Sequence, residues 1–334
     1  MKSSRFLLSA LLFPAALGVC ARAEAQDNSE QPQQTIRVSV DRVNVGVIVT
    51  DARGHFVEGL RREDFHVFDN GTEQPLTDFA AIEEPAQVLL LIEAGPAVYL
   101  LESSHLWAAN TLLDGLSADD RVAVVKYAEA PEGILDFTTD KQATAAALGE
   151  LRFNLGFGSL NMTSSVSKVL DWLASVHGKK AIVLLSTGLD TSTGNEAAAA
   201  MQHLRISDVL LFAVSLTGRL QDPPPANKKK SPAKNSAQIA QEFEKANGLL
   251  KRMAESTGGR AYFPKTREEF GPAYEEIAQL VRHEYGLAFA PQVNDGGVHT
   301  LEVRVDVHPA PGANVPAALY RVDHRQAYLA PANP

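Results

Sequence analysis

The sequence predicts a doubly wound α/β fold with a mostly parallel sheet, inserted in a small antiparallel β domain built from both chain ends. The first observation is the uninterrupted apolar run Val88–Ile92, which stops at Glu93-Ala94-Gly95-Pro96 and is typical of a strand covered on both faces. The second is the alternation of buried strand patterns with helical patterns over residues 86–283. The third is the alternation of apolar and polar residues in strand patterns at both ends of the chain, as in 43–49 and 300–308.

The first 25 residues have the pattern of a secretory signal peptide. Lys2 and Arg5 precede the apolar stretch Phe6–Val19, and Ala23-Glu24-Ala25 is a cleavage signature. The apolar stretch is too short to span a membrane well, and it contains Pro14. We therefore expect an exported protein, periplasmic or extracellular, with no integral membrane span in the mature chain.

Cys20 is the only cysteine, and it lies inside this leader. It allows two interpretations, a lipoprotein cysteine or plain cleavage after Ala25, and the bulky Val19 before it favours cleavage. A mature chain without Cys20 has no thiol, which excludes disulfides and thiolate metal sites.

The chain is acidic, with 31 Lys+Arg against 40 Asp+Glu and a formal net charge of −9. Such a charge argues against binding to nucleic acid or to an anionic membrane through the overall field. Residues 221–236 form a local exception, because Pro223–Pro225 is followed by Lys228–Lys230. We expect this segment to be a flexible basic loop; the alternative is a docking site for an anionic partner.

The N-terminal part begins with residues 26–35, whose Gln, Asn, Ser and Pro predict a disordered lead-in. Residues 36–85 then predict a β unit of about four strands, in which Asp69-Asn70-Gly71 is a strong hairpin turn. The expected strands are 36–40, 43–49, 65–68 and 77–82.

Residues 86–283 predict the α/β domain. Its expected strands after 88–92 are 121–127, an edge strand 133–137, 181–185, 209–214 and 260–263. Its expected helices are 98–116, 141–152, 162–176, 196–206, 239–256 and 272–283. Trp107 and Trp172 fall in helical patterns, and we expect both to pack in the core.

Residues 284–334 return to β patterns. Strands are expected at 285–289 and 300–308, with Asn294-Asp295-Gly296-Gly297 as the turn between them. We expect this segment to pack with 36–85, because the termini of an inserted domain usually lie close together.

In their order and spacing, several segments together resemble a von Willebrand factor type A domain. The likeness extends more closely to the bacterial VWFA-related proteins first grouped in acidobacteria. The segments that carry it are Val47–Asp51, 59–65, 68–71, 116–125, 180–186 and 283–291. The resemblance implies a Rossmann-like sheet, protein–protein recognition or adhesion, and, in most such domains, Mg²⁺ at a metal-ion-dependent adhesion site.

That site requires Asp-x-Ser-x-Ser after the first strand, a Thr in a Gly-rich loop and an Asp after the fourth strand. Mg²⁺ needs these oxygens because it is bound octahedrally by hydroxyls, a carboxylate and waters. The positions that correspond here are Glu93, Gly95, Ala97, Leu160 and Thr187. Two serine hydroxyls, one threonine hydroxyl and one carboxylate are missing, so the resemblance implies a degenerate site without metal or another cofactor.

A weaker possibility is a substitute Mg²⁺ site. Its candidate ligands are Glu93, Ser159, Asn161, Thr187 and Asp190. For Asp190 the simpler expectation is a loop or helix-capping role.

No motif of an enzyme stands out. The nine histidines are scattered without an H-x-x-x-H or H-E-x-x-H pair, and neither a G-x-S-x-G elbow nor a phosphate loop is present. We therefore expect no catalytic and no cofactor-binding residues.

The function that these observations favour is an exported non-enzymatic binding protein that recognises a protein partner through the carboxyl-end face of the sheet. The candidate partner-binding residues are Glu93, Pro96, Ser159, Asn161, Thr187 and Asp190. Three alternatives stay open: a scaffold or subunit of an envelope assembly, a Mg-dependent adhesion module with a rebuilt site, and an enzyme acting outside the cytoplasm.

Overall fold

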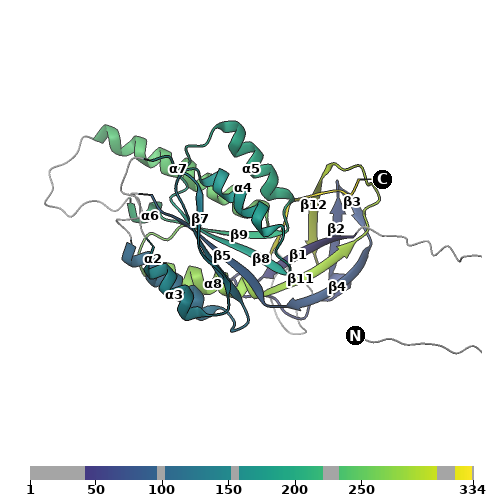
Figure 1. Ribbon diagram of the computed structural model, residues 1–334. Coiled ribbons are helices and arrows are strands. Elements are labelled where there is room, and N and C mark those ends of the chain that lie inside the picture. The colour runs from purple at the N-terminus through teal and green to yellow at the C-terminus, as the bar shows by residue number, and fades with distance from the viewer. Residues whose placement is uncertain (1–41, 96–101, 152–157, 221–232, 307–319, 333–334) are drawn as a thin grey trace, which may run out of the picture. The chain divides into compact units, whose positions relative to one another are not determined.

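The structure is a computed structural model, and it describes residues 42–95, 102–151, 158–220, 233–306 and 320–332 (Figure 1). Several expectations fall outside these residues. They concern the signal peptide 1–25 with Cys20, the lead-in 26–35, the strand 36–40, Pro96, Ala97, and 221–232 of the basic loop.

A six-stranded sheet forms the centre of the α/β part, in the order β10-β9-β8-β5-β6-β7. The central strand is the apolar run around Val88, as expected, and it pairs in parallel with β6 and β8. Only β7, at one edge, runs antiparallel to its neighbour. The strands are β5 (Ala86–Glu93), β6 (Arg121–Tyr127), β7 (Pro131–Thr138), β8 (Lys179–Ser186), β9 (Val209–Ser215) and β10 (Ala261–Tyr262).

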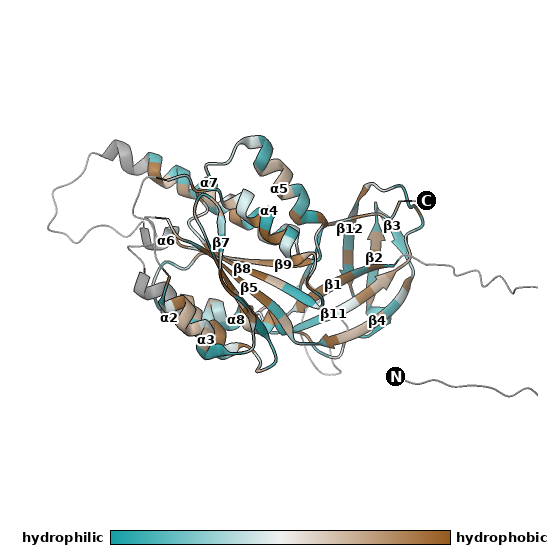
Figure 2. Ribbon diagram, viewed as in Figure 1, coloured by the Kyte–Doolittle hydropathy of each residue, from teal (hydrophilic) through white to brown (hydrophobic). Residues whose placement is uncertain are grey.

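Helices cover both faces of this sheet, which explains why its strands are apolar without alternation. Val88 and Leu90 of β5 pack in one core with one set of helices, and Leu89 and Leu91 pack in a second core on the other face. The first face holds α2 (Glu102–Gly115), α3 (Lys141–Gly149) and α8 (Phe270–Arg282), and the second holds α4 (Met162–Leu173), α5 (Gly194–Ile206) and α7 (Ala233–Ser256) (Figures 1 and 2). A short helix, α6 (Thr217–Leu220), follows β9.

Two four-stranded antiparallel sheets each combine strands from both ends of the chain. One has the order β13-β1-β11-β4 and the other β14-β12-β2-β3. Val45 pairs with Leu287 in the first sheet and Val67 with Val303 in the second, and all four side chains lie in one shared core. The strands are β1 (Val43–Thr50), β2 (Phe65–Asp69), β3 (Thr72–Gln74), β4 (Leu76–Glu83), β11 (His283–Phe289), β12 (Val298–Val305), β13 (Arg321–His324) and β14 (Ala327–Leu329).

The expected hairpin turn after β2 is confirmed. Asn70 and Gly71 both have positive φ, 47° and 81°, and they connect β2 to β3. Residues 40–334 form a single compact unit, so the expectation that these sheets make a domain of their own stays a prediction.

Arg260 ties the α/β part to the antiparallel sheets. Its guanidinium donates to Oδ2 of Asp323 on β13 at 2.9 and 2.6 Å, to Oε1 of Glu276 on α8 at 2.6 Å, and to Oγ1 of Thr50 on β1 at 2.7 Å. Only 7% of the Arg260 side chain is exposed. Because water cannot solvate the buried guanidinium, its charge must be compensated by the carboxylates of Asp323 and Glu276.

The expectation for Trp172 was wrong, because this side chain is 38% exposed. Trp172 belongs to the last turn of α4. The ring stacks on Phe137 of β7, with 5.3 Å between the ring centroids. The side chain of Trp107 lies outside the described side chains.

Candidate functional site

The candidate site lies where three neighbouring parallel strands end. Glu93 is the last residue of β5, Tyr127 the last of β6 and Ser186 the last of β8. The carboxyl ends of adjacent parallel strands meet at one edge of the sheet, so these side chains come together there.

Four donor groups of the protein lie within hydrogen-bond distance of Oε2 of the Glu93 carboxylate. They are the backbone N–H of Thr187 at 2.7 Å and the hydroxyls of Thr187 at 2.8 Å, Ser186 at 3.0 Å and Tyr127 at 3.3 Å. The hydroxyls of Tyr127 and Ser186 are only 2.6 Å apart, so one of them donates to the other and the second donates to Glu93. The group is a closed network rather than an open ligand set.

None of Glu93, Ser186, Thr187 and Tyr127 has exposed surface. Burial raises the pKa of Glu93, and the hydrogen bonds from Thr187, Ser186 and Tyr127 oppose that shift. Burial, and then the charge of Glu93, raise the pKa of Tyr127 well above its usual value. A carboxylate in this position is insulated from water and from solutes.

Leu160 fills the space beside this network. A Cβ atom built on Gly95 would lie 2.8 Å from Cδ2 of Leu160 and 3.4 Å from Oε1 of Glu93. An apolar side chain therefore stands against the strand end where a hydroxyl ligand would be needed. The donor hydrogens and this leucine do not fit a hard cation, which requires several free oxygen lone pairs.

The described residues contain no group of three or more His, Cys, Asp or Glu side chains arranged to hold a metal ion. Of the candidate substitute ligands, Asn161 and Asp190 have their polar atoms engaged in contacts with other residues.

Asp190 caps helix α4 from a neighbouring loop. Its carboxylate accepts from the backbone N–H of Met162 at 3.1 Å and of Thr163 at 3.3 Å, and from the Thr163 hydroxyl at 2.6 Å. These N–H groups belong to the first helical turn, which has no partners within the helix. The capping role expected for Asp190 is confirmed.

Asn161 joins two loops at this end of the sheet. Its amide N–H donates to the carbonyl of Glu129 at 2.9 Å, and its amide oxygen accepts from the Thr191 hydroxyl at 3.0 Å. The backbone N–H of Thr191 also donates to the carbonyl of Leu160 at 2.7 Å. Residues 158–161 and 189–192 therefore form one connected surface, which we call the top face.

The structure divides the residues expected to bind a partner. Ser159 is exposed, and Asn161 and Asp190 are half-buried on the top face. Glu93 and Thr187 have no exposed surface, and the Thr187 hydroxyl is hydrogen-bonded to the Glu93 carboxylate. They therefore support the top face from beneath and present no atoms to a partner. Pro96 lies outside the described residues.

Sequence reasoning missed Tyr127 and Ser186 as members of the network. A signal was present, since each is a hydroxyl residue at the end of a predominantly apolar strand, and both strands lie next to β5. Pairing these strand ends required the strand order, which the sequence pattern does not fix.

A second buried polar cluster lies in the antiparallel sheets. Nδ1 of His299 is 2.8 Å from Asp69 and its Nε2 is 3.2 Å from Asp295, while the Tyr328 hydroxyl donates to Asp69 at 2.9 Å. The cluster links β2, β12 and β14, so its role is to hold these strands together.

No helix among the described residues is both long enough and apolar enough to cross a membrane.

No family model matches the sequence, and no curated protein matches it. Among solved structures, similarity is found to a von Willebrand factor type A protein from Catenulispora acidiphila, with 12% identity, a TM-score of 0.42, and coverage of 81% of this chain and 71% of that one. An aerotolerance-related membrane protein from Bacteroides fragilis has 14% identity and a TM-score of 0.39 over 59% of this chain and 98% of its own. The manganese-loaded TRAP protein of Plasmodium vivax has 13% identity and a TM-score of 0.42 over 79% of this chain and 98% of its own.

These similarities are too distant to carry function from any of the three proteins to this chain. The fold itself is defined by the described strands: a doubly wound sheet, parallel except for one edge strand, with helices on both faces. It is the doubly wound, mostly parallel fold class that the sequence predicted.

Proposed function

We propose that this chain is an exported, non-enzymatic binding protein that recognises another protein through the top face of its type A-like domain, without a metal ion. The observation that carries the proposal is the closed network around Glu93, in which protein donors take the carboxylate that a cation would need. Recognition then depends on the loops alone.

The top face suits such a role. Ser159 and Thr191 are exposed, and the hydrogen bonds between the 158–161 and 189–192 loops hold both in a fixed arrangement. Loops that a rigid sheet holds in place are the usual location of binding residues.

The buried hydroxyls of Ser186 and Tyr127 do not support an enzymatic role. Ser186 and Tyr127 have no exposed surface and are bonded to each other and to Glu93, so neither can reach a substrate. A nucleophile needs both a base and access to the reacting atom.

Three further parts of the proposal come from the sequence. They are export, directed by the leader 1–25; membership of the VWFA-related proteins first grouped in acidobacteria; and insertion of the type A-like domain, residues 86–283, in a β domain made of 36–85 and 284–334.

The metal-free part is tested by calorimetric titration of the mature protein with Mg²⁺, Mn²⁺ and Ca²⁺, together with melting curves with and without EDTA. We expect no saturable heat and no shift of the melting temperature. Saturable binding that disappears in Glu93→Ala would overturn the metal-free proposal.

The recognition part is tested by retention of envelope proteins on the immobilised mature chain. Ser159→Arg is expected to reduce retention of a specific protein, and EDTA is expected to leave that retention unchanged. Thr77→Arg is the matched control, because Thr77 is equally exposed but belongs to β4, outside the top face. Equal retention by wild type, Ser159→Arg and Thr77→Arg would contradict the proposed face.

A further inference from the structure

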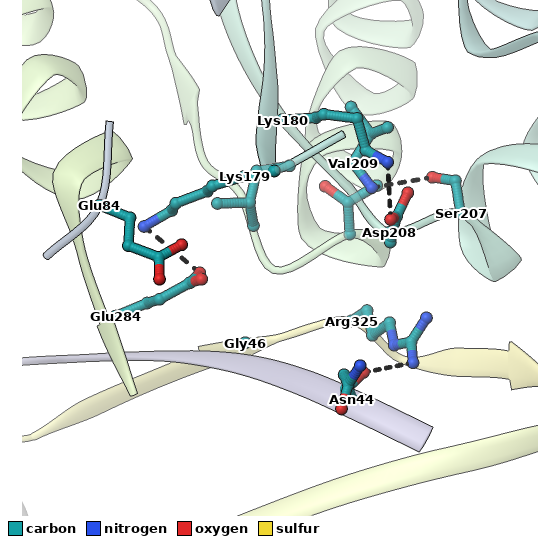
Figure 3. Close-up of a pocket in the computed structure, with 13 residues that line it drawn as sticks. Asn44, Gly46, Glu84, Lys179, Lys180, Ser207, Asp208, Val209, Glu284 and Arg325 are labelled. Carbon is teal, nitrogen blue, oxygen red and sulfur yellow. Dashed lines mark hydrogen bonds and ion pairs between the residues drawn. The ribbon is translucent and has the colours of Figure 1, made fainter. Parts of the chain in front are cut away.

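A second polar site lies at the other end of the parallel sheet. Strands β8 and β9 begin there, and a pocket of about 230 Å³ separates them from β1 and β11 (Figure 3). Its lining includes Lys179 and Lys180 at the start of β8, whereas Ser186 of the Glu93 network ends the same strand.

One end of the pocket has an excess of negative charge. Nζ of Lys179 lies 3.3 Å from Oε2 of Glu284, and the side chains are only 5% and 14% exposed. The carboxylate of Glu84 points toward the same ammonium group (Figure 3), and its charge also acts on it. Two carboxylates thus lie near one ammonium group, so these three side chains together carry one net negative charge.

Gly46 makes this arrangement possible. A Cβ atom at Gly46 would lie 2.7 Å from Oε2 of Glu284, so any other residue would push the carboxylate out of its place. The acidic end of the pocket is therefore built into the pairing of β1 with β11.

The other end has an excess of positive charge. Lys180 is paired with Asp208 at 2.7 Å, and Arg325 makes no ion pair with a carboxylate of the described residues. One amino group of Arg325 donates to the carbonyl of Asn44 at 2.5 Å. Its Nε–H is buried and meets no acceptor in the described part of the chain.

An unmet donor of this kind indicates that something else completes this end of the pocket. Buried polar groups in folded proteins are almost always paired, with protein, water or ligand, because desolvation without a partner costs free energy. A guanidinium stays charged even when buried and is well suited to hold a carboxylate.

We propose that this pocket binds a small zwitterion of the size of a free amino acid. The carboxylates of Glu84 and Glu284 receive its ammonium group, and Arg325 receives its carboxylate. The pocket is smaller than a typical site for a drug-sized ligand and has room for several water volumes of about 30 Å³ each, which matches a molecule of a few heavy atoms. Nothing in this proposal depends on the top face or on a protein partner.

The experiment uses the mature chain and L-alanine as the probe, measured by saturation-transfer NMR and by titration of chemical shifts. Acetate and methylammonium serve as half-ligands that each carry one of the two charges. We expect saturable binding of alanine and at least about tenfold weaker binding of either half-ligand, because each leaves one end of the pocket unpaired. Acetate binding as tightly as alanine would reduce the pocket to an anion site and overturn the proposal. Absence of alanine binding would overturn it as well.

Substitutions of the charged side chains test whether alanine binds in this pocket. Glu84→Gln and Arg325→Gln are each expected to weaken alanine binding about tenfold or more, since each removes one charge that the ligand needs. Glu84 is exposed, so its substitution leaves the core intact, and Arg325→Met, which also removes the charge, replaces Arg325→Gln where the latter does not fold. Glu129→Gln, an exposed glutamate outside the pocket, is the control. Unchanged affinity in Glu84→Gln would contradict the assigned orientation.

Discussion

Thr187 donates two hydrogen bonds to one carboxylate oxygen of Glu93, from its backbone N–H at 2.7 Å and from its hydroxyl at 2.8 Å. The pair connects the carboxyl end of β8 to that of β5.

Removal of the carboxylate should therefore destabilise the fold. We expect Glu93→Ala to lower the free energy of unfolding by about 3 kcal/mol, because it leaves a cavity and several buried donors without an acceptor. Glu93→Gln keeps the volume and one acceptor, and should cost about 1 kcal/mol. Urea denaturation followed by circular dichroism measures both changes. An unchanged free energy of unfolding in Glu93→Ala would show that the network contributes nothing to stability.

Stability should also depend on the titration of Glu93. Its pKa is raised above the ordinary value of 4.5 in the folded state, chiefly by burial. Between the ordinary and the raised pKa the folded chain holds more protons than the unfolded chain, so the contribution of this group to stability falls as the pH rises through that window. It is fully present below 4.5 and constant above the raised pKa.

The comparison of wild type with Glu93→Gln isolates this effect, because glutamine does not titrate. The difference in melting temperature, wild type minus variant, should decrease as the pH rises above about 4.5. A difference that increases with pH would mean that the hydrogen bonds outweigh burial and that the pKa is lowered.

The close approach of Leu160 to Gly95 predicts a coupled pair of substitutions. Gly95→Ala should destabilise the protein by about 1–3 kcal/mol, since the added Cβ would lie 2.8 Å from Cδ2 of Leu160. In a Leu160→Ala background the same change should cost about 1 kcal/mol less, because the clash is gone. A double-mutant cycle by denaturant unfolding measures the coupling, and additive costs would show that the two side chains do not compete for space.

Arg260 should be far more important for stability than an arginine on the surface. Arg260→Ala leaves Asp323, Glu276 and Thr50 without their shared donor, and we expect a loss of about 3–5 kcal/mol. The control is Arg42→Ala, whose ion pair with Asp78 is 3.8 Å long and more than half exposed. That change should cost less than about 1 kcal/mol. Similar midpoints for the two variants in urea would contradict the role given to Arg260.

Strand patterns in the sequence predicted most strands of the six-stranded sheet. The strand expected at 121–127 has those bounds in the structure, and the edge strand around Gly133 is confirmed with two residues more at its start and one more at its end. These segments are predictable because a strand buried on both faces has a continuous run of apolar residues, and a strand buried on one face has alternating apolar and polar residues. Both patterns can be recognised in a short stretch of sequence.

Strands β3, β13 and β14 were not predicted. In β13, Arg321-Val322-Asp323-His324 has one apolar residue in four, and it is a strand because it pairs with β1 and because Arg260 holds Asp323. Its partners are remote in the sequence, so no local pattern could reveal it.

The location of the candidate site could be predicted from the sequence, but the hydrogen bonds that its side chains make could not. The sequence placed Glu93 at the end of the central strand, and it showed which ligand types were missing. It could not show that Ser186 and Thr187 turn their donors onto Glu93, because that depends on the order of β5 and β8 in the sheet.

The position of β1 also has a consequence for how the chain is made. This strand lies between β11 and β13, so its first residues pair with Phe289 and its last with Arg321. During synthesis β1 emerges early and has no neighbours until nearly the whole chain has been translated, whereas the α/β part can fold from contacts nearer in sequence. An unpaired apolar strand is prone to join strands of other molecules. The last strands to be synthesised therefore protect the first one from aggregation. A chain truncated before residue 283 should aggregate through its unpaired strand β1.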